Sequence, residues 1–267
     1  MSVDFSCIIP TFRRPIELLE AVHSVLSQER VSVEVIVVDD SAERSARETI
    51  EGLGDPRVRY LSMARPTGGV PGRVRNMGWP LATGAFVHFL DDDDIVPKGH
   101  YAWAKGAFAR RPDVGVVFGR VQPFGPDTGQ LAHEFQYFAD AARRARICER
   151  LGQRAFCARQ FFQDTMLVCS AALIRRECVA ALGGFDEEIR LVEDVEFYAR
   201  AFRRYGVHFD NRVVLHYRIG PSLMHSRTSD EAIVKSFQRA HAKYEAEHGR
   251  ADFLALKVLA RSVFRYV

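Results

Sequence analysis

The sequence predicts an α/β fold with a mostly parallel central sheet, flanking helices and a helical C-terminal extension. Over the first 120 residues, strand-like apolar runs alternate with segments of helical periodicity, as in parallel sheets with helical connections. Two predicted strands end in acidic clusters, Asp39-Asp40 and Asp91 to Asp94. Because ligands of such sheets bind at the carboxyl ends of the strands, these clusters mark the expected site.

The first half of the chain contains five predicted strands, each a short apolar run typical of a buried strand. They are expected at residues 5–9, 33–38, 58–61, 85–90 and 114–121. Apolar residues at helical spacing predict helices after Pro15, at 45–53 and at 74–82. A loop rich in glycine and proline, residues 67–72, precedes the last of these helices.

The second half is less regular. Residues 128–164 are expected to be mainly helical and loop-like, and an apolar run follows at 166–174. A turn at 183–187 then precedes a predicted helix at 192–205 and a strand at 213–217. Residues 229–267 predict two helices separated near Gly249.

Composition places the chain among ordinary globular proteins, with 47% hydrophobic and 27% charged residues among 267. A net charge of +3 gives no reason to expect a nucleic-acid partner. No apolar stretch reaches the roughly 20 residues that span a bilayer, and the N-terminus lacks a secretory signal, so we expect a cytoplasmic protein. The five cysteines form no C-x-x-C pair and are expected to be buried thiols.

The acidic run Asp91 to Asp94 has two interpretations. Neighbouring carboxylates repel one another unless a cation offsets their charge. If side chains alternate as in a strand, Asp91 and Asp93 face one site while Asp92 and Asp94 face elsewhere. Such oxygen ligands suit Mg²⁺ or Mn²⁺, whereas the alternative is a solvated acidic loop or helix cap. The position directly after an apolar strand favours the metal.

Five other charged residues leave alternatives open. Asp40 at a strand end can accept a hydrogen bond from a nucleobase or a ribose hydroxyl. Arg73 and Arg75 follow the glycine-rich loop and are either phosphate ligands or surface arginines. Glu193-Asp194 either supplies charge at a helix N-terminus or includes a general base for an acceptor hydroxyl.

The ordered motifs resemble the inverting family 2 glycosyltransferases, which have the GT-A fold. The resemblance covers residues 3 to about 220 and is specific through order and spacing. Its motifs are Cys7-Ile8-Ile9-Pro10-Thr11-Phe12, Val35-Ile36-Val37-Val38-Asp39-Asp40-Ser41, Arg75-Asn76-Met77-Gly78, Ala82-Thr83-Gly84, Phe89-Leu90-Asp91-Asp92-Asp93-Asp94, Gly183-Gly184-Phe185-Asp186-Glu187 and Glu193-Asp194.

The resemblance implies a Rossmann-like sheet and a role for each matching residue. Pro10, Thr11 and Asp40 would line the nucleoside pocket, and Arg73 is our candidate for the phosphates. Asp91 and Asp93 match the Asp-x-Asp motif and would hold Mn²⁺ or Mg²⁺, with Asp91 nearer the ribose and Asp92 also beside the nucleotide. Asp194 would be the catalytic base of a single displacement that inverts the anomeric carbon.

The implied donor is a nucleotide-diphosphate sugar, with UDP the family's commonest carrier. The acceptor would be a saccharide or a lipid-linked hydroxyl in polysaccharide, glycolipid or glycoconjugate biosynthesis. We expect a glycosyltransferase domain at 1–225, with a nucleotide-binding half at about 1–120 and an acceptor-binding half at about 121–225, and a helical extension at 226–267. The alternative is an inactive nucleotide-sugar-binding or scaffold protein, which the intact Asp91, Asp93 and Asp194 disfavour.

Departures from the family pattern and two basic segments add further expectations. Gly220 stands where many relatives carry a histidine, which leaves His216 and His225 as weak candidates for the diphosphate. The arginines at 143–159 form a solvated helix face or a basic wall toward an anionic acceptor or membrane. The tail at 253–265 combines apolar and basic residues and could form an interfacial helix at the inner face of the membrane. We prefer the alternative, a helix packed on the domain or on a second subunit of a homodimer.

Overall fold

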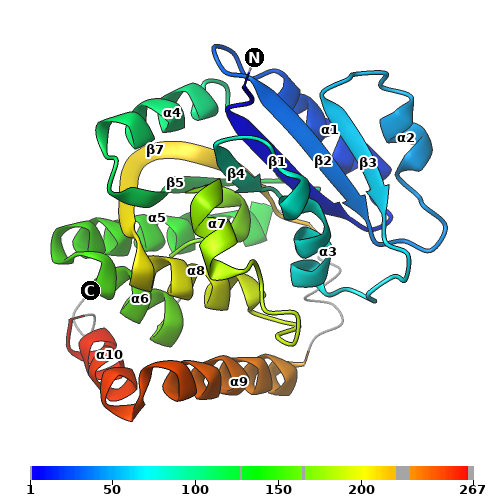
Figure 1. The fold of residues 1–267 in the computed structure, drawn as a ribbon. Helices are drawn as coiled ribbons and strands as arrows, with labels where there is room; N and C mark the ends of the chain where they lie inside the picture. Colours follow the sequence, from blue (N-terminus) through cyan, green and yellow to red (C-terminus); the bar gives the residue numbers. More distant parts are fainter. Residues whose placement is uncertain (1, 127, 164–165, 221–228, 264–267) are drawn as a thin grey trace.

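The computed structural model describes residues 2–126, 128–163, 166–220 and 229–263, and a single mixed sheet lies at its centre (Figure 1). The strands are β1 (Phe5–Thr11), β2 (Val33–Asp39), β3 (Val58–Ser62), β4 (Phe86–Phe89), β5 (Val114–Phe124), β6 (Ala172–Arg175) and β7 (Gly206–Arg218). Their order is β3-β2-β1-β4-β6-β5-β7, and β6 runs antiparallel to both neighbours while the other pairs are parallel. The predicted α/β fold with a mostly parallel sheet is therefore confirmed.

Helices flank this sheet, and two more form the end of the chain. They are α1 (Pro15–Leu26), α2 (Arg47–Glu51), α3 (Pro71–Gly78), α4 (His100–Arg110), α5 (Thr128–Leu151), α6 (Gln153–Phe162), α7 (Arg176–Leu182), α8 (Glu193–Arg204), α9 (Asp230–His248) and α10 (Arg250–Val263), with short 3₁₀ turns at Trp79–Leu81 and Cys169–Ala171.

Some boundaries differ from the predicted ranges for local reasons. α3 begins at Pro71, before the expected position 74, because a proline with its fixed φ suits the first position of a helix. The apolar run at 166–174 forms a strand only from Ala172, after the 3₁₀ turn. β7 begins at Gly206, well before the expected position 213, and its pairing with β5 shifts register in a stretch that has little apolar signal.

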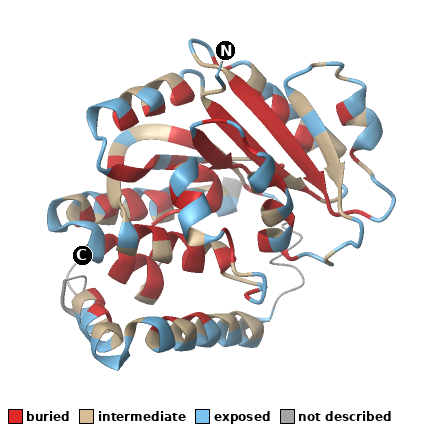
Figure 2. Cartoon of the chain, viewed as in Figure 1, coloured by how far each residue is buried: buried red, intermediate tan, exposed pale blue. Residues whose placement is uncertain are grey.

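The core lies on both faces of β1 and β2, which are buried almost throughout (Figure 2). Nearly continuous apolar sequence is what parallel strands covered on both faces require. α4 packs on the sheet through aromatic contacts, with ring centroids 4.6 Å apart for Phe5 and Tyr101 and 4.3 Å apart for Phe86 and Phe108. All five cysteines are buried and free, as expected of structural thiols.

The C-terminal extension consists of the two predicted helices, which meet at Gly249. α9 and α10 lie outermost, with α6 and α8 between them and the sheet (Figure 1). α10 packs on α6 with Leu256 and Ala260 buried, which agrees with the preferred packing of the tail on the domain, while Leu254 and Val258 are exposed. The predicted domain boundary at 225/226 falls outside the described residues. No described helix is both long and apolar enough to cross a membrane.

Close packing of α3 against the sheet generates a stability prediction for Gly78. A Cβ added there would lie 2.6 Å from Cγ2 of Ile8 and 3.1 Å from Cγ2 of Val38. We expect Gly78→Ala to lower the free energy of unfolding by about 1–3 kcal/mol, because overpacking outweighs the better helix propensity of alanine. The matched control is Gly106→Ala in α4, where the added Cβ meets only the end of the flexible Arg110 side chain. Urea unfolding measures both variants, and equal stabilities would contradict the prediction.

Candidate active site

A cleft of about 1920 Å³ opens beyond the carboxyl ends of β1, β2 and β4. One end is lined by the last residues of β1, by residues that follow the strands and by the glycine-rich loop, and it includes Pro10, Thr11 and Asp40. The other end is lined by α5, by α9 and by the segment before α8, through side chains that include Gln130, His133, Glu134, Tyr137, Glu188, Arg190, Lys235, Ser236 and Arg239. The cleft therefore joins an end built from the first hundred residues to an end built from the second half.

Three of the four clustered aspartates line the cleft. The expectation that Asp92 faces away from Asp91 and Asp93 is wrong, because all three lie at the cleft while Asp94 is buried beneath them. The reason is that β4 ends at Phe89 and the chain then turns, with the amide of Asp94 donating to the carbonyl of Asp91 at 3.3 Å. The alternation of side chains along a strand does not extend into such a turn.

Asp92 and Asp93 are tied to the segment that follows β1. The hydroxyl of Thr11 donates to Asp92 at 2.7 Å, and the backbone amide of Phe12 lies 3.4 Å from the same oxygen. Arg14 forms an ion pair with Asp93 and lies 3.5 Å from Asp92. The ends of β1 and β4 therefore present one polar surface of carboxylates with an arginine beside them.

Arg75 connects the acidic loop to the opposite side of the cleft. Its guanidinium donates to Asp91 at 2.6 Å and to Glu193 at 2.7 Å, and the residue is only 3% exposed. Its Cζ atom lies 5.3 Å from the centre of the Phe185 ring. Because one buried cation holds a carboxylate from each half, the two sides of the cleft have a fixed separation.

Glu193 and Asp194 begin α8, and Asp194 lines the cleft. One oxygen of Asp194 accepts the amide of Val195 at 2.8 Å. Burial raises the pKa of Asp194, and burial raises the pKa of Glu193 to about 7 although Arg75 opposes that shift. A carboxylate with a raised pKa accepts a proton more readily, so Asp194 is chemically suited to act as a base.

Comparison with known sequences identifies the family to which these motifs belong. Residues 6–183, two thirds of the chain, match the family described as Glycosyl transferase family 2. The chain belongs to that family. The matched range contains the acidic loop and ends just before the residues that lead to Glu193 and Asp194.

Two relatives and one solved structure place the chain within the family. The succinoglycan biosynthesis protein ExoO of Rhizobium meliloti is 36% identical over 93 residues, which are 35% of this chain and 26% of that protein. The GalNAc(5)-diNAcBac-PP-undecaprenol beta-1,3-glucosyltransferase of Campylobacter jejuni is 35% identical over 96 residues, 35% of this chain and 31% of that one. The matches thus span less than a third of either relative.

The structural likeness extends over nearly the whole chain. TarS of Staphylococcus aureus, residues 1–349 in complex with UDP-GlcNAc, superimposes with a TM-score of 0.70 at 17% sequence identity. The match covers 98% of this chain and 73% of that one. TarS is described as a poly(ribitol-phosphate) beta-N-acetylglucosaminyltransferase. This family 2 chain therefore has the GT-A fold.

Two further residues were predicted to bind the nucleotide, Asp40 and Arg73, and only one of them lies at the cleft. Asp40 lines the cleft, but its carboxylate accepts the amide and hydroxyl of Thr67 at 2.6 and 2.7 Å and so fastens the glycine-rich loop to the end of β2. Arg73 does not line the cleft, because its Nε donates to the carbonyl of Glu187 at 3.1 Å on the protein surface. The structure brings Arg75 to the cleft instead.

The histidine candidates and the basic segment contribute little to the cleft. His216 lies in β7, exchanges backbone hydrogen bonds with Ile95 at 2.9 and 3.0 Å, and does not line the cleft, although Tyr217 and Gly220 do. His225 lies outside the described residues. None of the arginines at 143–159 lines the cleft, and Arg154, for example, pairs with Asp252 of α10 at 2.9 Å. The arginine segment therefore does not form a wall toward this site.

The acidic loop can hold a divalent cation only together with other ligands. Among the described residues, no three His, Cys, Asp or Glu side chains are grouped to hold an ion. Burial and repulsion from Asp93 raise the pKa of Asp92 to about 7, and burial and repulsion from Asp91 raise the pKa of Asp93. A cation would relieve this repulsion, and Mg²⁺ commonly takes one or two carboxylates together with substrate phosphates. Asp91 and Asp93 fit that incomplete ligand set.

Sequence reasoning missed the supports beneath the acidic loop. The hydroxyl of Ser170 accepts the amide of Asp91 at 3.0 Å, and the carbonyl of Ser170 lies 2.8 Å from Nε2 of His88. Nδ1 of His88 lies 2.8 Å from the hydroxyl of Tyr101, so a neutral ring can donate to the carbonyl and accept from Tyr101. No motif marks Ser170, since its partners lie about 80 residues away in the chain.

His88 generates a prediction for stability against pH. Burial lowers the pKa of His88 from 6.5 to about 4, so on acidification the unfolded chain binds a proton before the folded protein does. Wild type should therefore lose stability between pH 6.5 and 4, by up to about 3 kcal/mol relative to a variant that cannot titrate. His88→Gln keeps a donor and an acceptor without titrating. Urea unfolding of both proteins between pH 7.5 and 4.5 should show their stability difference shrinking as the pH falls, and a constant difference would contradict this account.

Proposed function

We propose that this chain is an inverting glycosyltransferase that moves a sugar from a nucleotide diphosphate, with UDP as the first carrier to test, to an acceptor hydroxyl. The observation that carries the proposal is a cleft with Asp91 to Asp93 on one side and Asp194 on the other, joined through Arg75 and Glu193. The family supports transfer of a sugar. The solved TarS complexes with UDP and with UDP-GlcNAc support UDP as the carrier.

In this proposal the strand ends bind the donor. Pro10, Thr11 and Asp40 contact the nucleoside, and Asp91 and Asp92 lie beside the ribose and the diphosphate. Asp91 and Asp93 hold Mn²⁺ or Mg²⁺, which when bound supplies positive charge to the departing diphosphate. Arg14 and Arg75 lie next to the same carboxylates and keep the loop in place before a donor arrives.

Asp194 acts on the acceptor side. Its carboxylate takes the proton of the acceptor hydroxyl as the oxygen attacks the anomeric carbon from the face opposite the diphosphate. A single displacement of this kind inverts the configuration at that carbon. The succinoglycan biosynthesis protein of Rhizobium and the undecaprenol-linked glucosyltransferase of Campylobacter support an acceptor in polysaccharide or lipid-linked oligosaccharide assembly.

Nucleotide binding tests the donor side. We expect UDP, rather than GDP or dTDP, to bind in the presence of Mn²⁺ and to bind more weakly with a chelator. Asp93→Asn should weaken UDP binding at least tenfold in Mn²⁺ and hardly at all in chelator, because only the metal-dependent part needs that charge. Titration calorimetry measures each affinity. The control is Asp113→Asn, an exposed aspartate outside the cleft. Equal UDP affinity for wild type and Asp93→Asn in Mn²⁺ would exclude Asp93 as a metal ligand.

Turnover tests the base. Asp194→Asn should lower the rate of UDP release from the sugar nucleotide by about 100-fold or more, since general-base catalysis contributes roughly 10²–10⁴-fold. UDP affinity should stay within twofold of wild type, because in this proposal Asp194 binds neither the nucleoside nor the metal ion. A variant that retains turnover would place the base elsewhere. Tight nucleotide binding by wild type without any turnover would favour the nucleotide-sugar-binding alternative.

A further inference from the structure

The loop at 183–192 determines how α8 presents Asp194 to the cleft. It connects α7 to α8, and its last residues line the cleft. Gly184 has φ 77°, and a Cβ there would lie 2.5 Å from the side chains of Asn76 and Trp79. Val192, directly before Glu193, has φ 58°, which is unfavourable for a β-branched residue and persists only where surrounding contacts hold it. The direction of the first turn of α8 thus depends on contacts of this loop.

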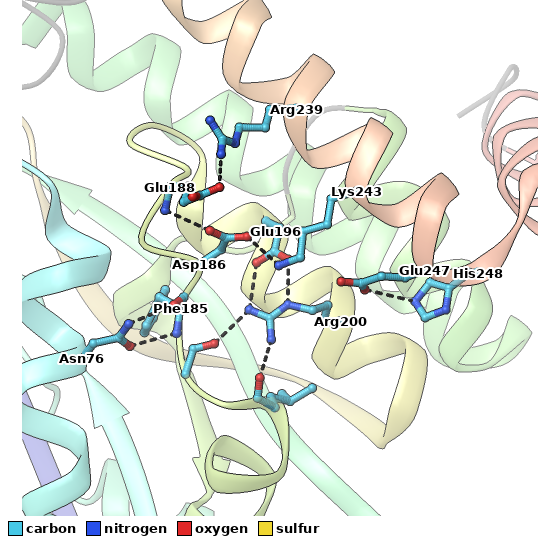
Figure 3. A network of polar contacts seen from close by, with 12 residues as sticks. Asn76, Phe185, Asp186, Glu188, Glu196, Arg200, Arg239, Lys243, Glu247 and His248 are labelled. Carbon is cyan, nitrogen blue, oxygen red and sulfur yellow. Dashed lines mark hydrogen bonds and ion pairs between the residues drawn. The ribbon is translucent and has the colours of Figure 1, made fainter.

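The inner side of the 183–192 loop is fastened by helices of the main domain. The side-chain amide of Asn76 in α3 donates to the carbonyl of Phe185 and accepts its amide, both at 2.9 Å. Arg200 in α8 donates to the carbonyls of Leu182 and Gly184, each at 2.8 Å (Figure 3). These contacts hold the first residues of the loop, and α3 also reaches its middle, where Asn76 donates to the side chain of Glu187 and Arg73 to its carbonyl, both at 3.1 Å.

α9 adds a second hold on the middle of the loop, from the outside. Nζ of Lys243 lies 2.6 Å from Asp186 and 3.3 Å from Glu196, so one ammonium joins the loop to α8 (Figure 3). The side chains of Asp186 and Glu196 are only 15% and 4% exposed. Arg239 also pairs with Glu188, but both of those side chains are more than half exposed, and such pairs contribute little. Lys243 therefore makes the strongest described tie between α9 and the loop.

The same helix forms a wall of the cleft. Ala232, Lys235, Ser236 and Arg239 line the cleft at helical spacing, and Lys243 follows one turn after Arg239. Opposite them, α5 contributes its own stripe, which includes Tyr137. α9 thus contacts the acceptor end of the cleft directly and holds the loop that leads to Asp194.

We propose that the C-terminal extension takes part in sugar transfer through Lys243, a positioning residue that holds the 183–192 loop, and with it Asp194, at the acceptor end of the cleft. This inference rests on the proposed function, since it takes Asp194 as the base. It assigns to α9 a role in catalysis that does not involve the donor, because the contacts of Lys243 lie away from the acidic loop.

Lys243→Met tests the proposal by removing the charge and keeping the length of the side chain. Hydrogen–deuterium exchange of peptides covering 183–192 should become at least tenfold faster, while exchange of β1 and β2 stays unchanged. The kcat for UDP release from UDP-GlcNAc or UDP-glucose should fall at least tenfold, with the donor KM and the UDP affinity within twofold of wild type. Lys243→Arg should restore both the exchange rate and kcat.

The matched control removes an equivalent pair elsewhere. Lys105 in α4 pairs with Asp4 at 2.7 Å and does not line the cleft, so Lys105→Met should behave as wild type in every measurement. Asp186→Asn breaks the Lys243 contact from the loop side and should reproduce the effect if Lys243→Met does not fold. Unchanged loop exchange in Lys243→Met, or a similar change in Lys105→Met, would overturn the proposal. If wild type binds no UDP, the proposed function fails, and loop exchange still decides whether Lys243 holds the loop.

Discussion

The ion pairs of Arg75 determine the geometry of this cleft. A buried guanidinium is stable only where carboxylates offset its charge, and removing either carboxylate would leave that charge uncompensated. Asp91 reaches it from the end of β4 and Glu193 from the start of α8, two elements about 100 residues apart in the chain. The 3₁₀ turn before β6 fixes Asp91 through the amide contact with Ser170, and α8 fixes Glu193. One cation therefore sets the distance across which a donor and an acceptor would meet.

The other three aspartates of the acidic loop each have a different polar partner. Asp94 is buried and accepts the backbone amide of Arg218 at 3.1 Å, which joins the acidic loop to the end of β7. Asp92 depends on the hydroxyl of Thr11, and Asp93 on the side chain of Arg14. Asp93 pairs with the partly exposed side chain of Arg14, whereas the nearest partners of Asp92 and Asp94 are Thr11 at the end of β1 and the backbone amide of Arg218 at the end of β7. This arrangement suits the proposed role of Asp93 as a ligand of the metal ion.

The sequence could predict the strand ends but not the orientation of individual side chains. Apolar runs locate β1, β2 and β4 because buried parallel strands need nearly continuous apolar sequence, and the acidic clusters at their ends must then lie at one edge. The choice between Arg73 and Arg75 needed the exact start of α3, since residues two apart on a helix point to nearly opposite sides. The inward position of Asp92 similarly depends on a turn that strand periodicity does not describe.

The two ends of the cleft differ in how far apart their contacting residues lie in the sequence. This difference explains why one end was predictable and the other was not. The proposed donor end is formed by segments before residue 94 that carry recognisable motifs. The acceptor end combines α5, the 183–192 loop and α9, which come together only through contacts such as Lys243 with Asp186, 57 residues apart. No local pattern specifies such a contact. Substitutions on α5 and α9 can therefore change this end of the cleft and leave the sheet unaltered.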